Sequence, residues 1–159
     1  MNLQKLELLQ QLPNEQKLAI VQTQEILKTQ GIQGLLSLLK DLDQELIPVN
    51  HYIAGGIYTR EILLPKGTIC IGAPHTRDFT ETMVTGSILI FGDTGTSLVS
   101  APFTKLAGAG TQKCGYILED TIWVTSHAVK GTTVEEAEFE TVEAQYLSLI
   151  NNRRTICQL

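Results

Sequence analysis

The feature that most constrains the fold is a run of short segments between residues 57 and 127, in which apolar and polar residues alternate and turn residues recur. Such alternation with regular turn signals is typical of antiparallel strands in a sandwich or closed barrel. No helical pattern separates the segments, which excludes a doubly wound parallel sheet. We expect strands at residues 57–64, 68–73, 80–83, 87–91, 96–99, 113–118 and 121–127.

Helical patterns flank this β region. Residues 1–47 carry apolar side chains at helical spacing with a break at Gly31. From Ile47-Pro48 onward this spacing is replaced by alternation of apolar and polar residues. The clearest apolar stripe comprises Ile32, Leu35, Leu36, Leu39, Leu42 and Leu46. It must be buried either on the barrel of its own chain or against another subunit.

A second helical pattern follows Gly131. Thr132 or Thr133 can cap a helix there, and the acidic residues of its first turns suit the positive end of the helix dipole. Its apolar stripe comprises Phe139, Val142, Tyr146 and Ile150. The chain is thus predicted to have a helical arm at 1–47, a β-barrel at 48–130 and a C-terminal helix at 131–159.

Composition excludes several classes of protein. Hydrophobic residues make up 43% of the chain and charged residues 18%, which is ordinary for a globular domain. The net charge of -5 argues against a nucleic-acid partner, and no apolar run is long enough for a membrane helix. Three cysteines without a CxxC spacing, and no secretory signal at the amino terminus, favour reduced thiols in the cytoplasm.

A candidate pocket follows from strand alternation. Residues 121–127 place Trp123, Thr125 and His127 on one face, and the preceding strand carries Tyr116, with Glu119-Asp120 as the expected turn. If that face is the interior, these side chains meet those of the 75–81 region. The predicted ligand pocket comprises His75, Glu81, Tyr116, Trp123, Thr125 and His127. The alternatives are a core position for Trp123 and surface positions for the two histidines.

Three stretches carry a family resemblance: residues 58–67 (YTREILLPKG), His75 followed eleven residues later by Gly86, and residues 108–127 (GAGTQKCGYILEDTIWVTSH). In their order and spacing they resemble single-domain cupins, the RmlC-like jelly-roll superfamily. More narrowly, they are similar to small cupin-like proteins of tailed phages. The resemblance covers residues 57–128 and implies one cupin-type β-jelly-roll barrel with the two helical appendages.

The metal-binding pattern of cupins is largely absent. That pattern has His-x-His, a glutamate and a glycine in its first motif, and Pro-x-Gly followed by a histidine in its second. His75 matches the second histidine, but the other three ligand positions hold Ala73, Phe79 and Lys113. One histidine does not hold a divalent ion, so we expect neither a metal nor a cofactor.

Two functional hypotheses follow. The first is a degenerate, non-enzymatic cupin that forms a homo-oligomer through its helical arm and barrel faces. The phage resemblance implies a structural or assembly role beside other phage proteins, in the host cytoplasm or the virion. The second is a cupin that binds a sugar or nucleotide, or an epimerase-like enzyme with His75 or His127 as base, Tyr116 as acid, and Glu81 or Asp120 as the orienting carboxylate.

Overall fold

The computed structural model describes residues 7, 9–41, 47–92 and 95–147. Leu42, Leu46, Ile150 and Cys157, which enter the sequence predictions, lie outside the described residues. Within the described ranges no helix is both long enough and apolar enough to cross a membrane.

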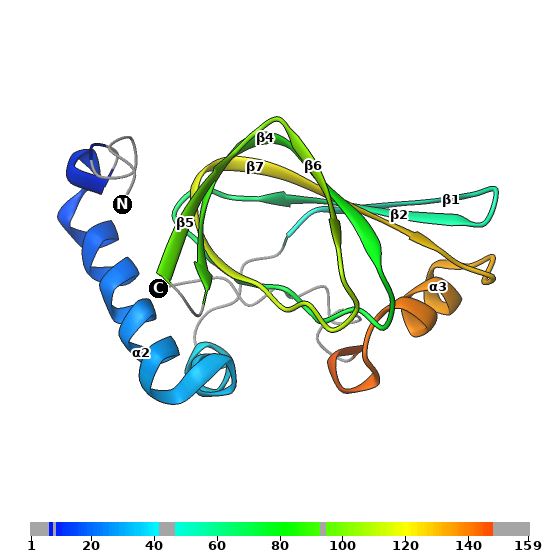
Figure 1. Cartoon of the computed structure of the whole chain (residues 1–159), viewed down its shortest axis with the longest axis horizontal. Coiled ribbons are helices and arrows are strands. Elements are labelled where there is room, and N and C mark those ends of the chain that lie inside the picture. The colour runs from blue at the N-terminus through cyan, green and yellow to red at the C-terminus, as the bar shows by residue number, and fades with distance from the viewer. Residues whose placement is uncertain (1–6, 8, 42–46, 93–94, 148–159) are drawn as a thin grey trace.

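The strands form one antiparallel sheet that curls into a barrel (Figure 1). The hydrogen-bonded order is β1-β2-β7-β4-β5, with β3 also paired to β7 and β6 to β4. The strand bounds are β1 Val49–Ala54, β2 Ile57–Leu64, β3 Ile69–Ile71, β4 Phe79–Gly92, β5 Gly95–Ser100, β6 Phe103–Ala107 and β7 Cys114–Ala128. The mainly β fold expected from the sequence is therefore confirmed.

Two long strands replace what the sequence pattern divides into four. Segments 80–83 and 87–91 are parts of β4, and segments 113–118 and 121–127 are parts of β7. The turn expected at Glu119-Asp120 is wrong, because both residues lie inside β7. The pairing of β4 with β7 is instead irregular here, so the ladder bends without ending. Strands β1 and β6 were not predicted.

Gly86 lies at the centre of this irregularity. Its φ of 88° is unfavourable for residues with a side chain. A Cβ atom at this position would lie 2.6 Å from the carbonyl oxygen of Asp120 and 2.8 Å from the Cα of Thr121. The close approach of β4 to β7 therefore requires glycine here.

Helix α2 (Asn14–Leu39) lies along the outside of the barrel (Figure 1). It kinks at Gly31, where φ is 68° and ψ is -174°, in agreement with the break expected there. A cluster of buried side chains joins the helix to β3, β4 and β7: Ile20, Leu35, Leu39, Ile69, Ile71, Leu89, Cys114, Tyr116 and Leu118. Ile32 and Leu36 pack against the same cluster, so the chain's own sheet covers the described part of the apolar stripe.

Helix α3 (Val134–Thr141) begins with a capping box. The side chain of Thr133 accepts a hydrogen bond from the backbone N–H of Glu136, and the Glu136 carboxylate accepts one from the backbone of Thr133. The helix ends earlier than its expected stripe, because Val142 is extended and forms a β-bridge with His75. Phe139, within α3, is 72% exposed, which makes its predicted place in an apolar stripe wrong.

The 3-10 turn η1 (Ala144–Tyr146) follows α3. Val142 and Tyr146 are buried, although neither belongs to α3. The hydroxyl of Tyr146 accepts a hydrogen bond of 2.9 Å from the side chain of Gln33 on α2. Residues 134–146 thus form a strap across one end of the barrel, tied to the helix on its outside.

The packing of α2 can be tested with a matched pair of leucine variants. Leu35 is 0% exposed and Leu38 is 48% exposed, in the same helix. We expect Leu35→Ala to lower the free energy of unfolding by about 2–5 kcal/mol, because it opens a cavity under the helix. Leu38→Ala should cost less than about 1 kcal/mol. Equal effects in chemical denaturation would contradict the packing described here.

Candidate functional site

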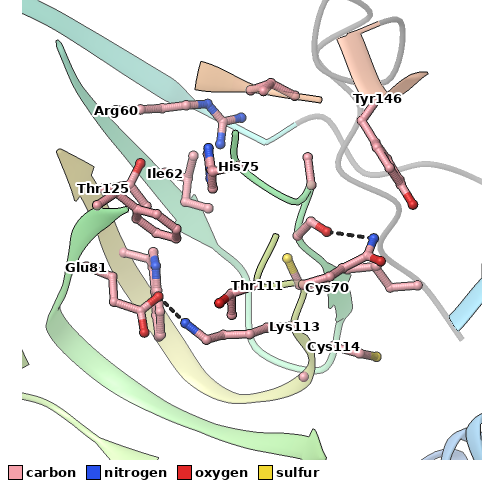
Figure 2. A pocket seen from close by; sticks show the side chains of 18 of the residues that line it. Arg60, Ile62, Cys70, His75, Glu81, Thr111, Lys113, Cys114, Thr125 and Tyr146 are labelled. Atoms are coloured by element: carbon pink, nitrogen blue, oxygen red, sulfur yellow. Dashed lines mark hydrogen bonds and ion pairs between the residues drawn. The ribbon is translucent and has the colours of Figure 1, made fainter. Parts of the chain in front are cut away.

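The barrel interior contains a cavity of about 150 Å³. Strands β2, β3, β4 and β7 contribute to its walls, and residues of the α3 strap close part of it. Figure 2 shows Arg60, Ile62, Glu81 and Thr125 reaching into it from these neighbouring strands.

The register of the strands arranges the inward-facing side chains in rows across the sheet. Residues 122–126 of β7 each face one residue of β2 and one of β4, and alternate residues point to the same face. The three rows are Tyr58, His127 and Phe79; Arg60, Thr125 and Glu81; and Ile62, Trp123 and Met83. The cavity therefore has an aromatic row, a charged row and an apolar row.

The aromatic row continues into His75, which precedes β4. The ring of His75 lies 4.4 Å from those of His127 and Phe79, measured between centroids, and the rings of Phe79 and His127 are 4.9 Å apart. Burial, the largest cause, lowers the pKa of His75 to about 4 and the pKa of His127 to about 3. Both imidazoles are therefore neutral at neutral pH.

The two histidines differ in their hydrogen bonds. Nδ1 of His75 lies 3.1 Å from the carbonyl oxygen of Thr141, so this nitrogen carries the proton and donates it. His127 is 2% exposed, and neither of its ring nitrogens has a hydrogen-bond partner among the described residues. A neutral imidazole has one donor and one acceptor, so His127 presents both to the cavity.

Glu81 in the charged row is 2% exposed and is paired with two lysines. Lys113 forms a direct ion pair with it, and the ammonium of Lys105 lies 3.4 Å from its other oxygen. Burial lowers the pKa of Lys113, while its hydrogen bond to Glu81 opposes that shift. The same ammonium lies 5.7 Å from the ring centroid of Trp123.

The rest of the charged row has unused hydrogen-bonding capacity. Nε of Arg60 and Oγ1 of Thr125 are buried and have no hydrogen-bond partner within the described ranges. The two residues face each other in register on β2 and β7. A polar atom left unpaired in a protein interior costs about 1–3 kcal/mol, so these atoms call for an explanation.

A hydrogen-bonded group links the cavity to the strap. The Tyr58 hydroxyl lies 2.8 Å from Nδ1 of His51 and donates to the carboxylate of Glu138 on α3 at 3.4 Å. Burial raises the pKa of both Tyr58 and Glu138. Tyr58 and Glu138 both line the cavity, so this group fixes the position of α3 over it.

The structure brings five of the six predicted pocket residues together around one cavity: His75, Glu81, Trp123, Thr125 and His127. Tyr116 does not lie there. It is buried in the cluster that packs against α2. Because β7 is one continuous strand, alternation places Tyr116 on the opposite face from Trp123. The predicted position of Tyr116 in the pocket is therefore wrong.

The sequence reasoning missed Tyr58, Arg60 and Glu138 as cavity residues. A signal for the first two was present. The strand predicted at 57–64 has the bounds of β2, and alternation places Tyr58, Arg60, Ile62 and Leu64 on one face. An arginine among apolar residues on that inward face marks a functional position. Glu138 carried no such signal, because it reaches the cavity only through the placement of α3.

The residues at the cupin ligand positions do not fit a metal ion. Ala73, His75, Phe79 and Lys113 all line this cavity, as the motif spacing implies. The Phe79 ring packs against His75, and Lys113 brings a positive charge that pairs with Glu81. Among the described residues no group of three or more His, Cys, Asp or Glu side chains is placed to hold a metal.

No model of a known protein family matches this chain, and no curated protein matches it. Solved structures do. Ectoine synthase from P. lautus is 13% identical, with a TM-score of 0.51, over 76% of this chain and 82% of that chain. KdgF from Halomonas sp. is 13% identical, with a TM-score of 0.43, over 55% and 87% of the two chains. A cupin domain from Bordetella pertussis is 16% identical, with a TM-score of 0.42, over 54% and 96%.

These likenesses concern the fold. The likeness to ectoine synthase, whose TM-score exceeds 0.5, agrees with the antiparallel barrel described above and supports the jelly-roll fold expected from the sequence. The structures named here give no support for the narrower resemblance to proteins of tailed phages.

The metal content of the protein is a direct test of the substituted ligand positions. We expect less than about 0.1 equivalents of zinc, iron or nickel per purified chain, because Ala73, Phe79 and Lys113 stand at three of the four ligand positions. Elemental analysis of protein purified without chelators measures this. About one equivalent of a transition metal would contradict the expectation.

The buried histidines predict a specific dependence of stability on pH. Their pKa values of about 4 and about 3 in the folded state lie below the ordinary 6.5, so the unfolded chain binds more protons between pH 6.5 and 4. Stability is therefore complete above pH 6.5 and falls as the pH drops, by up to about 1.4 kcal/mol per pH unit for each histidine.

The measurement is urea denaturation between pH 7.5 and 5, above the range where most carboxylates titrate. His127→Phe removes one of the two groups and should make the slope clearly shallower. His75 and the carboxylates remain in both proteins. Identical slopes in the wild type and in this variant would contradict the assignment.

Proposed function

We propose that this protein binds a small polar molecule in the barrel cavity without a metal ion. The observation that supports it is the set of buried polar atoms in the cavity wall without partners among the described residues, above all both ring nitrogens of His127. A buried imidazole with no partner destabilises the fold, and an apolar side chain of similar shape would not. Convergent polar groups in a concave, mostly apolar site are typical of ligand binding.

The volume of the cavity limits the size of the ligand that it can enclose. A volume of about 150 Å³ is comparable to that of a cavity that holds benzene. A nucleotide would leave most of its atoms outside, so the nucleotide part of the second hypothesis is disfavoured. A single small metabolite fits better.

Binding is favoured over proton-transfer catalysis. An efficient general base has a pKa near the working pH, whereas burial holds the pKa of His75 at about 4 and that of His127 at about 3. Tyr116, the acid in the epimerase-like hypothesis, faces away from the cavity. Both observations favour binding over the epimerase-like alternative.

The structural hypothesis has lost part of its motivation. The described part of the stripe in residues 1–47 is buried on the chain's own sheet, so it does not need a second subunit to cover it. Leu18 and Val21, on the outer side of α2, remain more than half exposed. A homo-oligomer through the arm, and a place in the cytoplasm or a virion, stay predictions.

The test uses His127→Phe, which removes the unpartnered nitrogens and keeps an aromatic ring of similar size. We expect this variant to be at least as stable as the wild type at pH 7.5, because it removes a buried unpaired polar group. It should also lose the rise in Tm that a ligand produces, since binding stabilises the folded state.

The screen covers neutral, anionic and cationic molecules of on the order of six to twelve non-hydrogen atoms. Thr80→Val, at an exposed position of β4, is the control and should respond to ligand as the wild type does. The proposal fails if no compound class raises the Tm of the wild type, or if His127→Phe responds equally.

A further inference from the structure

The charged groups of the cavity wall are unequally paired. Glu81 pairs with Lys113, which lines the cavity, and with Lys105, which is half exposed and lies outside the lining, so these three residues together carry one surplus positive charge. Arg60, which stays protonated in proteins, takes no part in any ion pair found among the described residues. The carboxylate of Glu138, which also lines the cavity, accepts a hydrogen bond from Tyr58.

The field of Arg60 nevertheless reaches several neighbours. It opposes protonation of His75 and His127, and it favours the ionised form of Glu138. Both imidazoles are neutral at neutral pH, so they add no charge to the cavity wall. Among the lining residues, Arg60 and Lys113 balance Glu81 and Glu138 when Glu138 is ionised, but burial raises the pKa of Glu138 and so opposes its ionisation. Lys105, paired with Glu81 from outside the lining, adds one further positive charge next to the cavity.

Hydrogen-bond donors lie beside the arginine. Thr125 faces Arg60 in register, and His127 is two residues further along the same strand on the same face. The hydroxyl of Thr125 and the imidazole of His127 each have a proton to donate and no partner among the described residues. One group with two acceptor oxygens would satisfy the arginine and one of these donors together.

Much of the remaining cavity wall is apolar. Ile62 and Trp123 face each other in the row next to Arg60 and Thr125, and Ile88, Ile90 and Ile117 also line the cavity. An occupant therefore combines one anionic end with a compact hydrocarbon body. The volume limits that body to about the size of a benzene ring.

We propose that the cavity binds a small organic carboxylate, with its two oxygens on Arg60 and on the Thr125 and His127 donors and its apolar body against Trp123. This rests on the proposed function, since it names the ligand class for the same cavity. A guanidinium suits this ligand because its planar donors match the two oxygens of a carboxylate. A free phosphate would use the same charge but not the apolar side.

The experiment compares acids with their uncharged analogues by calorimetric titration of the full-length protein. The probes are benzoate, cyclohexanecarboxylate and 2-methylpropanoate, each beside its amide, with benzylamine and inorganic phosphate as further arms. We expect at least one carboxylate to bind at least about tenfold more tightly than its amide, because the amide cannot pair with the arginine charge. Benzylamine and phosphate should bind more weakly still.

The matched variants are Arg60→Gln and Lys66→Gln, which remove the same charge inside and outside the cavity. Lys66 is exposed, in the turn between β2 and β3. Arg60→Gln should weaken carboxylate binding at least about tenfold and Lys66→Gln less than about twofold. Arg60→Lys keeps the charge but not the planar geometry, and should give an intermediate loss.

The outcomes separate the two proposals. If acids and amides bind equally, or if Arg60→Gln and Lys66→Gln bind alike, the carboxylate assignment is overturned while binding in the cavity stands. If phosphate binds as tightly as the carboxylates, the proposal that the ligand has an apolar organic body is overturned. If no probe of any charge binds and the wider screen also fails, the binding function itself is wrong. The comparison of acids with amides needs no variant, so it remains decisive even if Arg60→Gln does not fold.

Discussion

The barrel depends on the register in which β7 pairs with β2 on one side and β4 on the other. Side chains alternate between the two faces of a strand, so a slip of one residue would turn His127, Thr125 and Trp123 away from the interior. The irregular pairing around Gly86 bends the two long strands without breaking them. One pairing scheme therefore closes the barrel and also places the side chains of the cavity.

The interior combines two ways of burying polar groups. Glu81 is buried but paired with two lysines, which offsets much of the loss of hydration. Arg60, Thr125 and His127 keep buried polar atoms without partners among the described residues, so the fold carries a local destabilisation there. Groups that lower stability are expected at functional sites, where the bound molecule completes their interactions.

Local patterns predicted much of the fold and only part of the site. The strand at 57–64 and the break at Gly31 follow from alternation and from glycine chemistry, so they were recognisable. Glu119 inside β7 looked like part of a turn, because only the pairing with β4 shows that the strand continues. That error assigned Tyr116 to the cavity. Arg60 was missed because an arginine in a strand is ordinarily exposed, although alternation places it on the same face as Ile62 and Leu64.

The two halves of β7 serve different neighbours. Tyr116 and Leu118 pack beneath α2 on the outside of the barrel, whereas Trp123 and Thr125 line the cavity inside it. Since the sets differ in both face and position along the strand, replacements in one leave the contacts of the other intact. In evolutionary terms, related chains can diverge in the molecule they recognise, one interior side chain at a time, while the helix that supports the barrel stays in place.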